Sequence, residues 1–309
     1  MKNYAKLIKL TLLVVSSTLM FSCSDDDSPT QNNSITDIAS ENPNFSILVD
    51  ALTRADLAET LDQEGSYTVF APTNDAFIDF LDANGFESLD DVPLPTLTQV
   101  LLNHVVSGTN LSSGLTTGYV KTLATGSASS TNTLSMFINT ESGVRLNGVS
   151  SVTTADITAD NGVIHVVDAV IGLPTIVTHA TANPNFSTLA TLLTEQELVG
   201  TLNGTASSPF TVFAPLNSAF DTATLNLYGG LNSTQKTAVL TYHVVPGANV
   251  LSNAIPSGPI TTFETGTFTI SGTVITDEQS RATNIVATDV QASNGVIHAV
   301  NQVLLPNLD

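Results

Sequence analysis

The sequence predicts two consecutive α+β domains of one kind, which follow a short processing segment. Two observations predict this class. Four sequence blocks recur in the same order, at a period that is domain-sized and well above the roughly 20 to 50 residues of solenoid repeats. Within each repeat, helix-like patterns come first and strand-like patterns follow, an order that is typical of α+β domains rather than of doubly wound sheets.

The repeated blocks define the two domains. They are NPNFS (42–46 and 183–187), TVFAP (68–72 and 211–215), HVV (104–106 and 243–245) and NGVIH (161–165 and 294–298). Their offsets of 141, 143, 139 and 133 drift as loop insertions and deletions would make them drift. We place the first domain at 35–174 and the second at 175–309, with the boundary at Leu173-Pro174. So short a connection predicts a restrained tandem rather than two domains on a flexible linker.

Each domain is expected to open with a helix, because apolar residues recur at i, i+3, i+4 and i+7 from Phe45 and again from Phe186. Asn42 and Asn183 are the expected N-caps, and each is followed by proline. Capping-box spacings then predict a second helix, and asparagines ahead of apolar residues predict the cap of a third: Thr53 with Asp56, Thr194 with Glu197, Asn74 and Asn217.

The second half of each domain is expected to be a sheet. The run TVFAP predicts one strand per domain, and Thr, Val, Ile, Gly and Ser dominate 119–171 and 260–305. An Asn-Gly pair lies between strand-like runs at 161–162 and at 294–295. Each pair predicts a hairpin turn.

Three of these blocks together resemble fasciclin domains. The segment TVFAPTNDAF (68–77) is similar to the first characteristic block of that family, NGVIHVVD (161–168) to the second, and YHVVPG (242–247) to the Tyr-His segment between them. The resemblance covers 35–309. It implies two tandem fasciclin-like domains, each a compact β-wedge of about seven strands with helices packed around it. It also implies an extracellular protein associated with adhesion, matrix or polysaccharide.

The resemblance assigns residues to structure and to binding. Residues of the structural family motif are His104, His165, His298, Asn161 and Asn294. The chain departs from the family at Asn103, where a tyrosine is usual before the histidine, and at Leu216, where Thr73 supplies a threonine in the first copy. Tyr242 and His243 are therefore the candidates for contact with a partner. The alternative, given equal weight, is that Tyr242 packs under a loop of its own domain.

The first 23 residues have the pattern of a signal peptide. Lys2, Lys6 and Lys9 precede an apolar run at 10–21, which is too short to span a bilayer. Cys23, the only cysteine, then resembles the lipidated first residue of bacterial lipoproteins; an ordinary signal peptide with a chance cysteine is the alternative. The tetrapeptide Ser24, Asp25, Asp26 and Asp27 resembles the export tag of Bacteroidetes lipoproteins, and 24–34 is expected to be a disordered acidic tether. We therefore expect an exported protein on the outer membrane, lipid-anchored and facing the cell exterior.

The charge excludes some partners. Without the first 23 residues, the chain keeps five basic residues against 28 acidic ones, a formal net charge of −23. Such a surface repels phosphate backbones and anionic lipid headgroups. Nucleic-acid binding is therefore excluded, and membrane contact is expected only through the lipid.

Five histidines are the candidates for acid–base or metal chemistry, and four of them form repeat-related pairs within apolar runs. No carboxylate–histidine–nucleophile order, Gly-x-Ser-x-Gly, phosphate loop or EF-hand spacing accompanies them. We expect half-buried, hydrogen-bonding roles for these four, with no catalytic site, no metal and no cofactor. His179 has no repeat partner, since Ile38 takes its place, and is expected at the surface or between the domains. Asp156 with Asp160, and Asp289, leave a weak calcium site open, although aspartates near turns usually form the turn.

Two functions remain. The first is a monomeric adhesion or binding module that presents both domains to an extracellular protein or polysaccharide. The second is an accessory lipoprotein that binds a small ligand or a glycan. An enclosed pocket of about 300 Å³ or more, with a few convergent polar groups, would favour the second, and closed cores with shallow grooves would favour the first.

Overall fold

The computed structural model describes residues 33–63, 65–204 and 206–308. The predicted signal peptide, Cys23 and the acidic export tag lie outside these residues. The tether predicted for 24–34 extends two residues too far, because Asn33 and Ser34 already belong to the folded domain. Asn33 exchanges hydrogen bonds with Asp160, and Ser34 is the buried N-cap of the first helix, in a capping box with Asp37.

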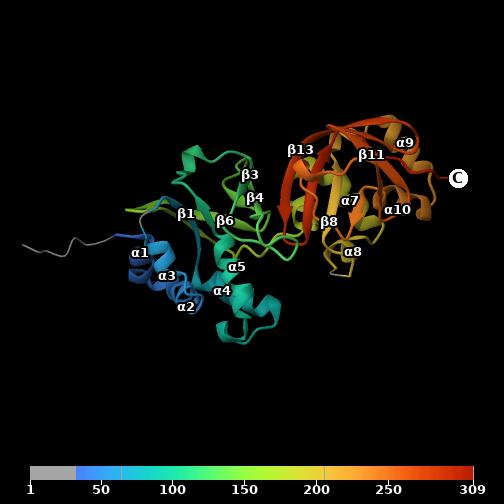
Figure 1. The fold of residues 1–309 in the computed structure, drawn as a ribbon. Coiled ribbons are helices and arrows are strands. Elements are labelled where there is room, and N and C mark those ends of the chain that lie inside the picture. Colours follow the sequence, from blue (N-terminus) through green and yellow to red (C-terminus); the bar gives the residue numbers. More distant parts are fainter. Residues whose placement is uncertain (1–32, 64, 205, 309) are drawn as a thin grey trace, which may run out of the picture. The chain divides into compact units, whose positions relative to one another are not determined.

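Each domain contains one seven-stranded mixed sheet, which confirms the predicted α+β class (Figure 1). The strand order is β2-β1-β7-β6-β5-β4-β3 in the first domain and β10-β11-β12-β13-β14-β8-β9 in the second. The other neighbouring strands of each sheet pair in antiparallel fashion, but the pairs β1–β7 and β8–β14, one strand in from an edge, are parallel. Each parallel pair joins the first and the last strand of its domain, so the segments between them form one long crossover.

The two domains have nearly the same order of elements. The first contains α1 (Ile35–Glu41), η1 (Pro43–Phe45), α2 (Ser46–Arg54), α3 (Ala58–Asp62), β1 (Tyr67–Pro72), α4 (Asn74–Asn84), η2 (Leu89–Asp91), α5 (Leu94–Asn103), β2 (Val105–Ser107), η3 (Ser112–Gly114), β3 (Gly118–Lys121), β4 (Ser135–Asn139), β5 (Arg145–Leu146), β6 (Ser150–Ala159) and β7 (Gly162–Val167). The second contains α6 (Ile176–Ala182), η4 (Pro184–Phe186), α7 (Ser187–Glu195), α8 (Val199–Asn203), β8 (Phe210–Pro215), η5 (Asn217–Ala219), α9 (Thr222–Gly230), α10 (Ser233–Thr241), β9 (Val244–Pro246), η6 (Ser252–Ala254), β10 (Pro259–Thr261), β11 (Thr267–Ser271), β12 (Val274–Thr276), β13 (Ala282–Ala292) and β14 (Gly295–Val300).

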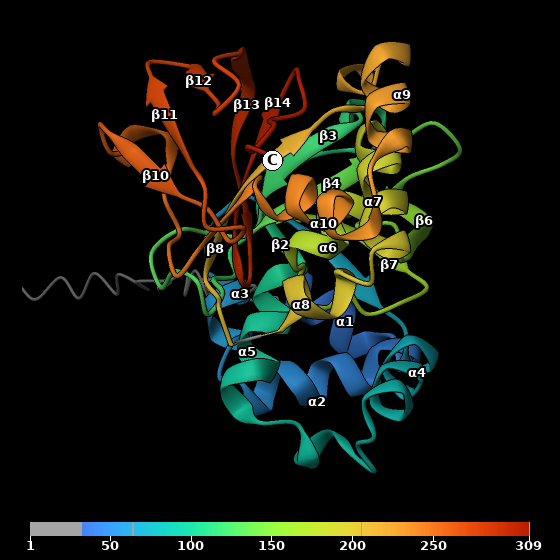
Figure 2. The same cartoon turned by 90° about the vertical axis from the view of Figure 1, so that its right-hand side faces the viewer.

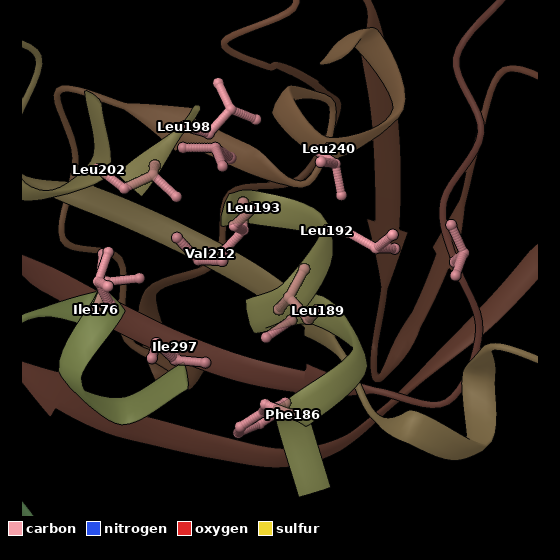
Figure 3. Packing of buried hydrophobic residues seen from close by; sticks show 14 of the residues in the cluster. Ile176, Phe186, Leu189, Leu192, Leu193, Leu198, Leu202, Val212, Leu240 and Ile297 are labelled. Carbon is pink, nitrogen blue, oxygen red and sulfur yellow. The ribbon is translucent and has the colours of Figure 1, made fainter. Parts of the chain in front are cut away.

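Each domain is held by two apolar clusters, one on either side of its central strands. In the first domain, Val69 and Ala71 of β1 pack against the helices, which lie together in Figures 1 and 2. Phe70 points to the opposite side and packs with Met136 and Ile138 of β4. The alternation follows from the period of two along a strand. Figure 3 shows the larger cluster of the second domain, in which α6, α7 and α8 pack on β8 and β14.

The predicted first helix is present in each copy, but a short helix precedes it. Asn42 and Asn183 cap a 3-10 turn, as their side chains accept from the backbone two residues on. The predicted capping boxes at 53–56 and 194–197 are wrong. Thr53 and Thr194 donate to carbonyls four residues back, and Asp56 and Glu197 take positive φ, which ends the helix instead.

The predicted caps at Asn74 and Asn217 lie one residue too far along. Thr73 is the N-cap of α4, and Asn74 instead accepts from the amide of Ile47. Leu216 replaces that threonine in the second domain, has no side-chain acceptor, and precedes only a 3-10 turn. A new helix, α9, begins after Asp221, whose carboxylate caps it.

The two predicted hairpins are present, shifted by one residue. Ala159 pairs with Gly162 and Ala292 with Gly295, so each turn is formed by the two residues between them. The glycines begin the next strand. A Cβ at Gly162 would lie 2.0 Å from the carbonyl oxygen of Tyr67, which explains the need for glycine there. In the part of the chain that the structure describes, we find no helix long and apolar enough to cross a membrane.

Candidate functional site

His104 and His243 hold helices to the segments that follow the sheets. The Nδ1–H of each ring donates to the carbonyl four residues earlier, Val100 or Val239, at 2.7 Å. The Nε2 accepts from the backbone amide of Ile171 or Leu304 at 2.9 Å. Burial lowers the pKa of both imidazoles to about 4, so both are neutral at physiological pH.

His165 and His298 fasten a bulge in the long strands β6 and β13. Their Nδ1 accepts from the backbone amide of Asp156 at 3.2 Å and of Asp289 at 3.4 Å. Their Nε2–H donates to the carbonyls of Asn110 and Val250 at 2.9 Å. Both rings are fully buried and pack on a phenylalanine of β1 or β8. Both nitrogens of each ring are therefore in use, which leaves none for a metal or a substrate.

The hairpin asparagines tie the end of the domain to its beginning. Asn161 Oδ1 accepts from the amide of Ile35 at 2.9 Å, and its Nδ2 donates to the carbonyl of Leu61 at 2.6 Å. Asn294 repeats both bonds with Ile176 and Leu202 at 3.0 and 2.7 Å. Each asparagine thus joins its hairpin to the first and third helices of its domain.

The candidate contact residues Tyr242 and His243 lie inside the second domain. Tyr242 is fully buried, its hydroxyl donates to the carbonyl of Thr267 at 2.7 Å, and it accepts from the amide of Glu278 at 3.2 Å. In the first domain Asn103 is equally buried and donates to the carbonyl of Gly172 at 3.0 Å. In this conformation neither residue of the Tyr-His pair offers side-chain surface to a partner.

The carboxylates of the aspartates beside the bulges also accept hydrogen bonds within the domain. The Asp156 carboxylate accepts from the hydroxyl and the amide of Ser112 at 2.5 and 2.7 Å, and Asp289 does the same with Ser252. The Ser112 bonds hold the pKa of Asp156 below its usual range. Among the residues that the structure describes, no three His, Cys, Asp or Glu side chains are grouped as metal ligands would be.

The domains meet at a joint in which Asn183, from a repeated block, contacts residues that lie outside the repeated blocks. Tyr119 of β3 packs against the core cluster of the second domain, and its hydroxyl accepts from Asn183 Nδ2 at 3.3 Å. Its ring lies edge-on to His179 at 5.4 Å between centroids and 5.0 Å from Phe137. His179 is thus an interdomain residue, fully buried. Burial lowers its pKa to about 4 and raises that of Tyr119 to about 12.

Polar contacts complete the joint. Lys121 Nζ donates to the carbonyl of Asp289 at 3.1 Å, and Ser135 Oγ accepts from the amide of Gln291 at 3.0 Å. The carbonyl of Ser293 accepts from the amide of Ala128 at 2.9 Å. Burial lowers the pKa of Lys121. These contacts agree with the restrained tandem that the short connection predicts.

The sequence could have indicated the joint through what is not repeated. Leu123 and Phe263 donate to equivalent strand residues, Val105 and Val244, which aligns the segments that precede them. Counting back from Leu123 and Phe263, Tyr119 corresponds to Pro259 and Lys121 to Thr261, so these two residues of the joint are found only in the first copy. A residue that only one copy carries is the signal of a contact that only one copy makes.

A model of the fasciclin domain matches residues 43–174 and again 184–306, which together are most of the chain.

The chain belongs to the fasciclin family.

Two relatives support this assignment by their sequence identity. Protein sll1483 of Synechocystis is 42% identical over 138 residues, which are 43% of this chain and 73% of that protein. Immunogenic protein MPT70 of Mycobacterium tuberculosis is 33% identical over 134 residues, 41% of this chain and 66% of the other. The solved fasciclin domain pair of the insect cell adhesion molecule fasciclin I covers 89% of this chain and 96% of its own, with 18% identity and a TM-score of 0.47.

The fasciclin domains have closed cores, and a larger cavity lies between them. The cavities within the two helix–sheet cores are about 20 Å³ each, room for little more than one water molecule. The cavity beside Tyr119 measures about 440 Å³ and is lined by both domains.

Proposed function

We propose that this protein is an exported, lipid-anchored surface module that binds an extracellular protein or polysaccharide through the exposed faces of its two fasciclin domains. The family supports this, because fasciclin proteins are generally non-enzymatic adhesion or binding proteins. The observation that carries the proposal is the state of the four repeat-related histidines, each of which uses both ring nitrogens for backbone hydrogen bonds. With these groups committed, recognition is left to surface side chains.

The anchor and the charge fit this role. Two or three acyl chains on Cys23, each CH₂ contributing about 0.8 kcal/mol, would hold the protein at the membrane. A mature net charge of −23 disfavours polyanions and favours either a neutral polysaccharide or a basic protein surface. The fixed joint would present both domains together rather than as independent binders.

The test is binding of the chain from Ser24 onward to immobilised polysaccharides and matrix proteins, measured at increasing salt. A basic protein partner should show affinity that falls as salt screens the charges, and a neutral polysaccharide should show affinity that hardly changes. Failure to bind any member of either class, with an intact melting transition, would contradict the proposal. The closed cores favour this function over the small-ligand alternative, since the larger cavity between the domains is open to solvent rather than enclosed.

A further inference from the structure

The cavity between the domains has one wall from each of them. Tyr119 and Phe137 come from β3 and β4 of the first domain. Phe186 and Leu216 come from the second, together with the exposed Val286 of β13 and the buried Ile297 of β14. Figure 3 labels Phe186 and Ile297, which reach this cavity from the edge of the second domain's core. A volume of about 440 Å³ is in the range of small-molecule sites. Of the three aromatic residues in its walls, Tyr119 is partly exposed, and Phe137 and Phe186 are buried.

The second domain is apolar here at positions where the first is polar. Leu216 corresponds to Thr73, Val286 to Thr153, and Ala287 to Thr154. The threonine pair on β6 is exposed, as outward residues of such a strand normally are. Val286 is also 51% exposed, so the contact between the domains does not cover it. Domain packing alone therefore does not account for the apolar character of this face.

The polar groups at the cavity restrict the charge and the hydrogen-bonding groups that a ligand can have. The Tyr119 hydroxyl accepts from Asn183, and its own hydrogen has no acceptor among the described residues. With a pKa of about 12, this hydroxyl keeps its proton and can donate. The exposed Asn185 amide lies at the same cavity. No lining residue is charged, and the chain is strongly acidic, so an anionic ligand is disfavoured.

We infer that this cavity binds a neutral, largely apolar small molecule that contains an aromatic ring and a hydrogen-bond acceptor. The ring packs on Tyr119, the one aromatic residue of the cavity wall that is not buried, and the acceptor takes the hydrogen of the Tyr119 hydroxyl. Leu216 and Val286 cover the remaining apolar surface of the ligand. This inference does not rest on the identity of the macromolecule that the outer surface binds.

The experiment uses two neutral fluorescent naphthalene probes of similar size. One carries a ketone acceptor (6-propionyl-2-dimethylaminonaphthalene), and the other lacks it (N-phenyl-1-naphthylamine). Each is titrated with the chain from Ser24 onward, which contains every described residue. We expect saturable binding at one site with a dissociation constant of about 100 µM or tighter. Tyr119→Phe should weaken the ketone probe by about five- to tenfold and leave the other probe within about twofold.

The repeat supplies a matched control. Leu216→Thr with Val286→Thr and Ala287→Thr gives the second domain the residues of the first, and should weaken both probes by about tenfold or more. Thr153→Val with Thr154→Ala makes the reverse change on the first domain and should leave both affinities unaltered. Val286→Thr alone, at a half-exposed position, guards against loss of folding and should weaken binding about threefold.

Three results would overturn the inference. They are the absence of saturable binding by either probe, equal binding by the triple variant with an unchanged melting curve, and equal losses from the reverse change on the first domain. Equal weakening of both probes by Tyr119→Phe would overturn the assigned role of the hydroxyl.

Discussion

The interdomain histidine gives a prediction that separates burial from hydrogen bonding. His179 is fully buried, and neither ring nitrogen has a hydrogen-bond partner of normal geometry among the described residues. Burial lowers its pKa to about 4, and the nearby Lys121 charge adds to this, although the backbone of Gln291 opposes it. The first domain carries Ile38 at the equivalent position. We therefore consider His179→Ile.

The sign follows from which state binds the proton more tightly. The unfolded chain, with a histidine pKa of 6.5, takes up a proton that the folded chain refuses until about pH 4. The stability due to the neutral ring is complete above pH 6.5 and is lost as the pH falls toward 4. Between pH 7.5 and 5.0 this one group costs the folded state about 2 kcal/mol.

His179→Ile should remove that cost. At pH 7.5 the variant should differ from the parent by less than about 1.5 kcal/mol, because no hydrogen bond is broken and the volume is similar. Between pH 7.5 and pH 5.0, the difference in unfolding free energy between variant and parent should shift by about 2 kcal/mol in favour of the variant. The control is His243→Ile, which leaves the Leu304 amide and the Val239 carbonyl unpaired and should lose about 2 kcal/mol or more already at pH 7.5.

The assay is urea unfolding followed by far-UV circular dichroism at both pH values, since the chain has no tryptophan to report by fluorescence. An identical pH dependence in parent and His179→Ile would refute the reasoning, because His179 would then not be neutral in the fold. A large loss for His179→Ile at pH 7.5 would show that its nitrogens bond to something that this structure does not contain.

The remaining predictions concern the anchor and the structural motif. Cys23→Ser should move the protein from the membrane fraction to the soluble fraction, and persistent membrane attachment would contradict the lipoprotein assignment. His165→Ala or His298→Ala should lower the free energy of unfolding by roughly 1–3 kcal/mol, because backbone groups lose their hydrogen bonds. The molecules that remain folded should still bind the extracellular partner. Tyr242→Asn should lower the melting temperature of the second domain without changing the affinity of the folded protein for its partner. A loss of affinity at an unchanged melting temperature would instead show that Tyr242 contacts the partner.

The sequence predicts the fold because its strongest signals are local and occur twice. The turn that holds Asn161 and the strand 68–72 could be recognised from residue types alone, and the structure pairs them in one sheet. The errors arose where a side chain has two uses. Thr53 has the spacing of a cap but bonds back to its own helix, and Asn74 bonds to a different helix while Thr73 caps.

The joint between the domains was not predictable by the same means. Tyr119 and Lys121 look like ordinary strand residues, and their contacts with Asn183 and Asp289 depend on how two folded domains meet. Hydrophobic periodicity describes one helix or strand at a time and carries no information on contacts between folded domains. Only the comparison of the two copies, with Pro259 and Thr261 in the equivalent places, marks these positions as special.

The parallel pairing near one edge of each sheet also limits the order in which the chain can fold. Tyr67 pairs with Gly162 and Phe210 with Gly295, partners that are separated by most of a domain. Contacts of such high contact order form slowly, because a long loop must close before they contribute. As the chain emerges from a ribosome or an export channel, the first domain cannot complete its core until Ile171 is available to His104. The second domain waits for Leu304, so a truncation that removes Leu304 and the residues after it should leave the first domain folded and the second without its hydrogen bond to His243.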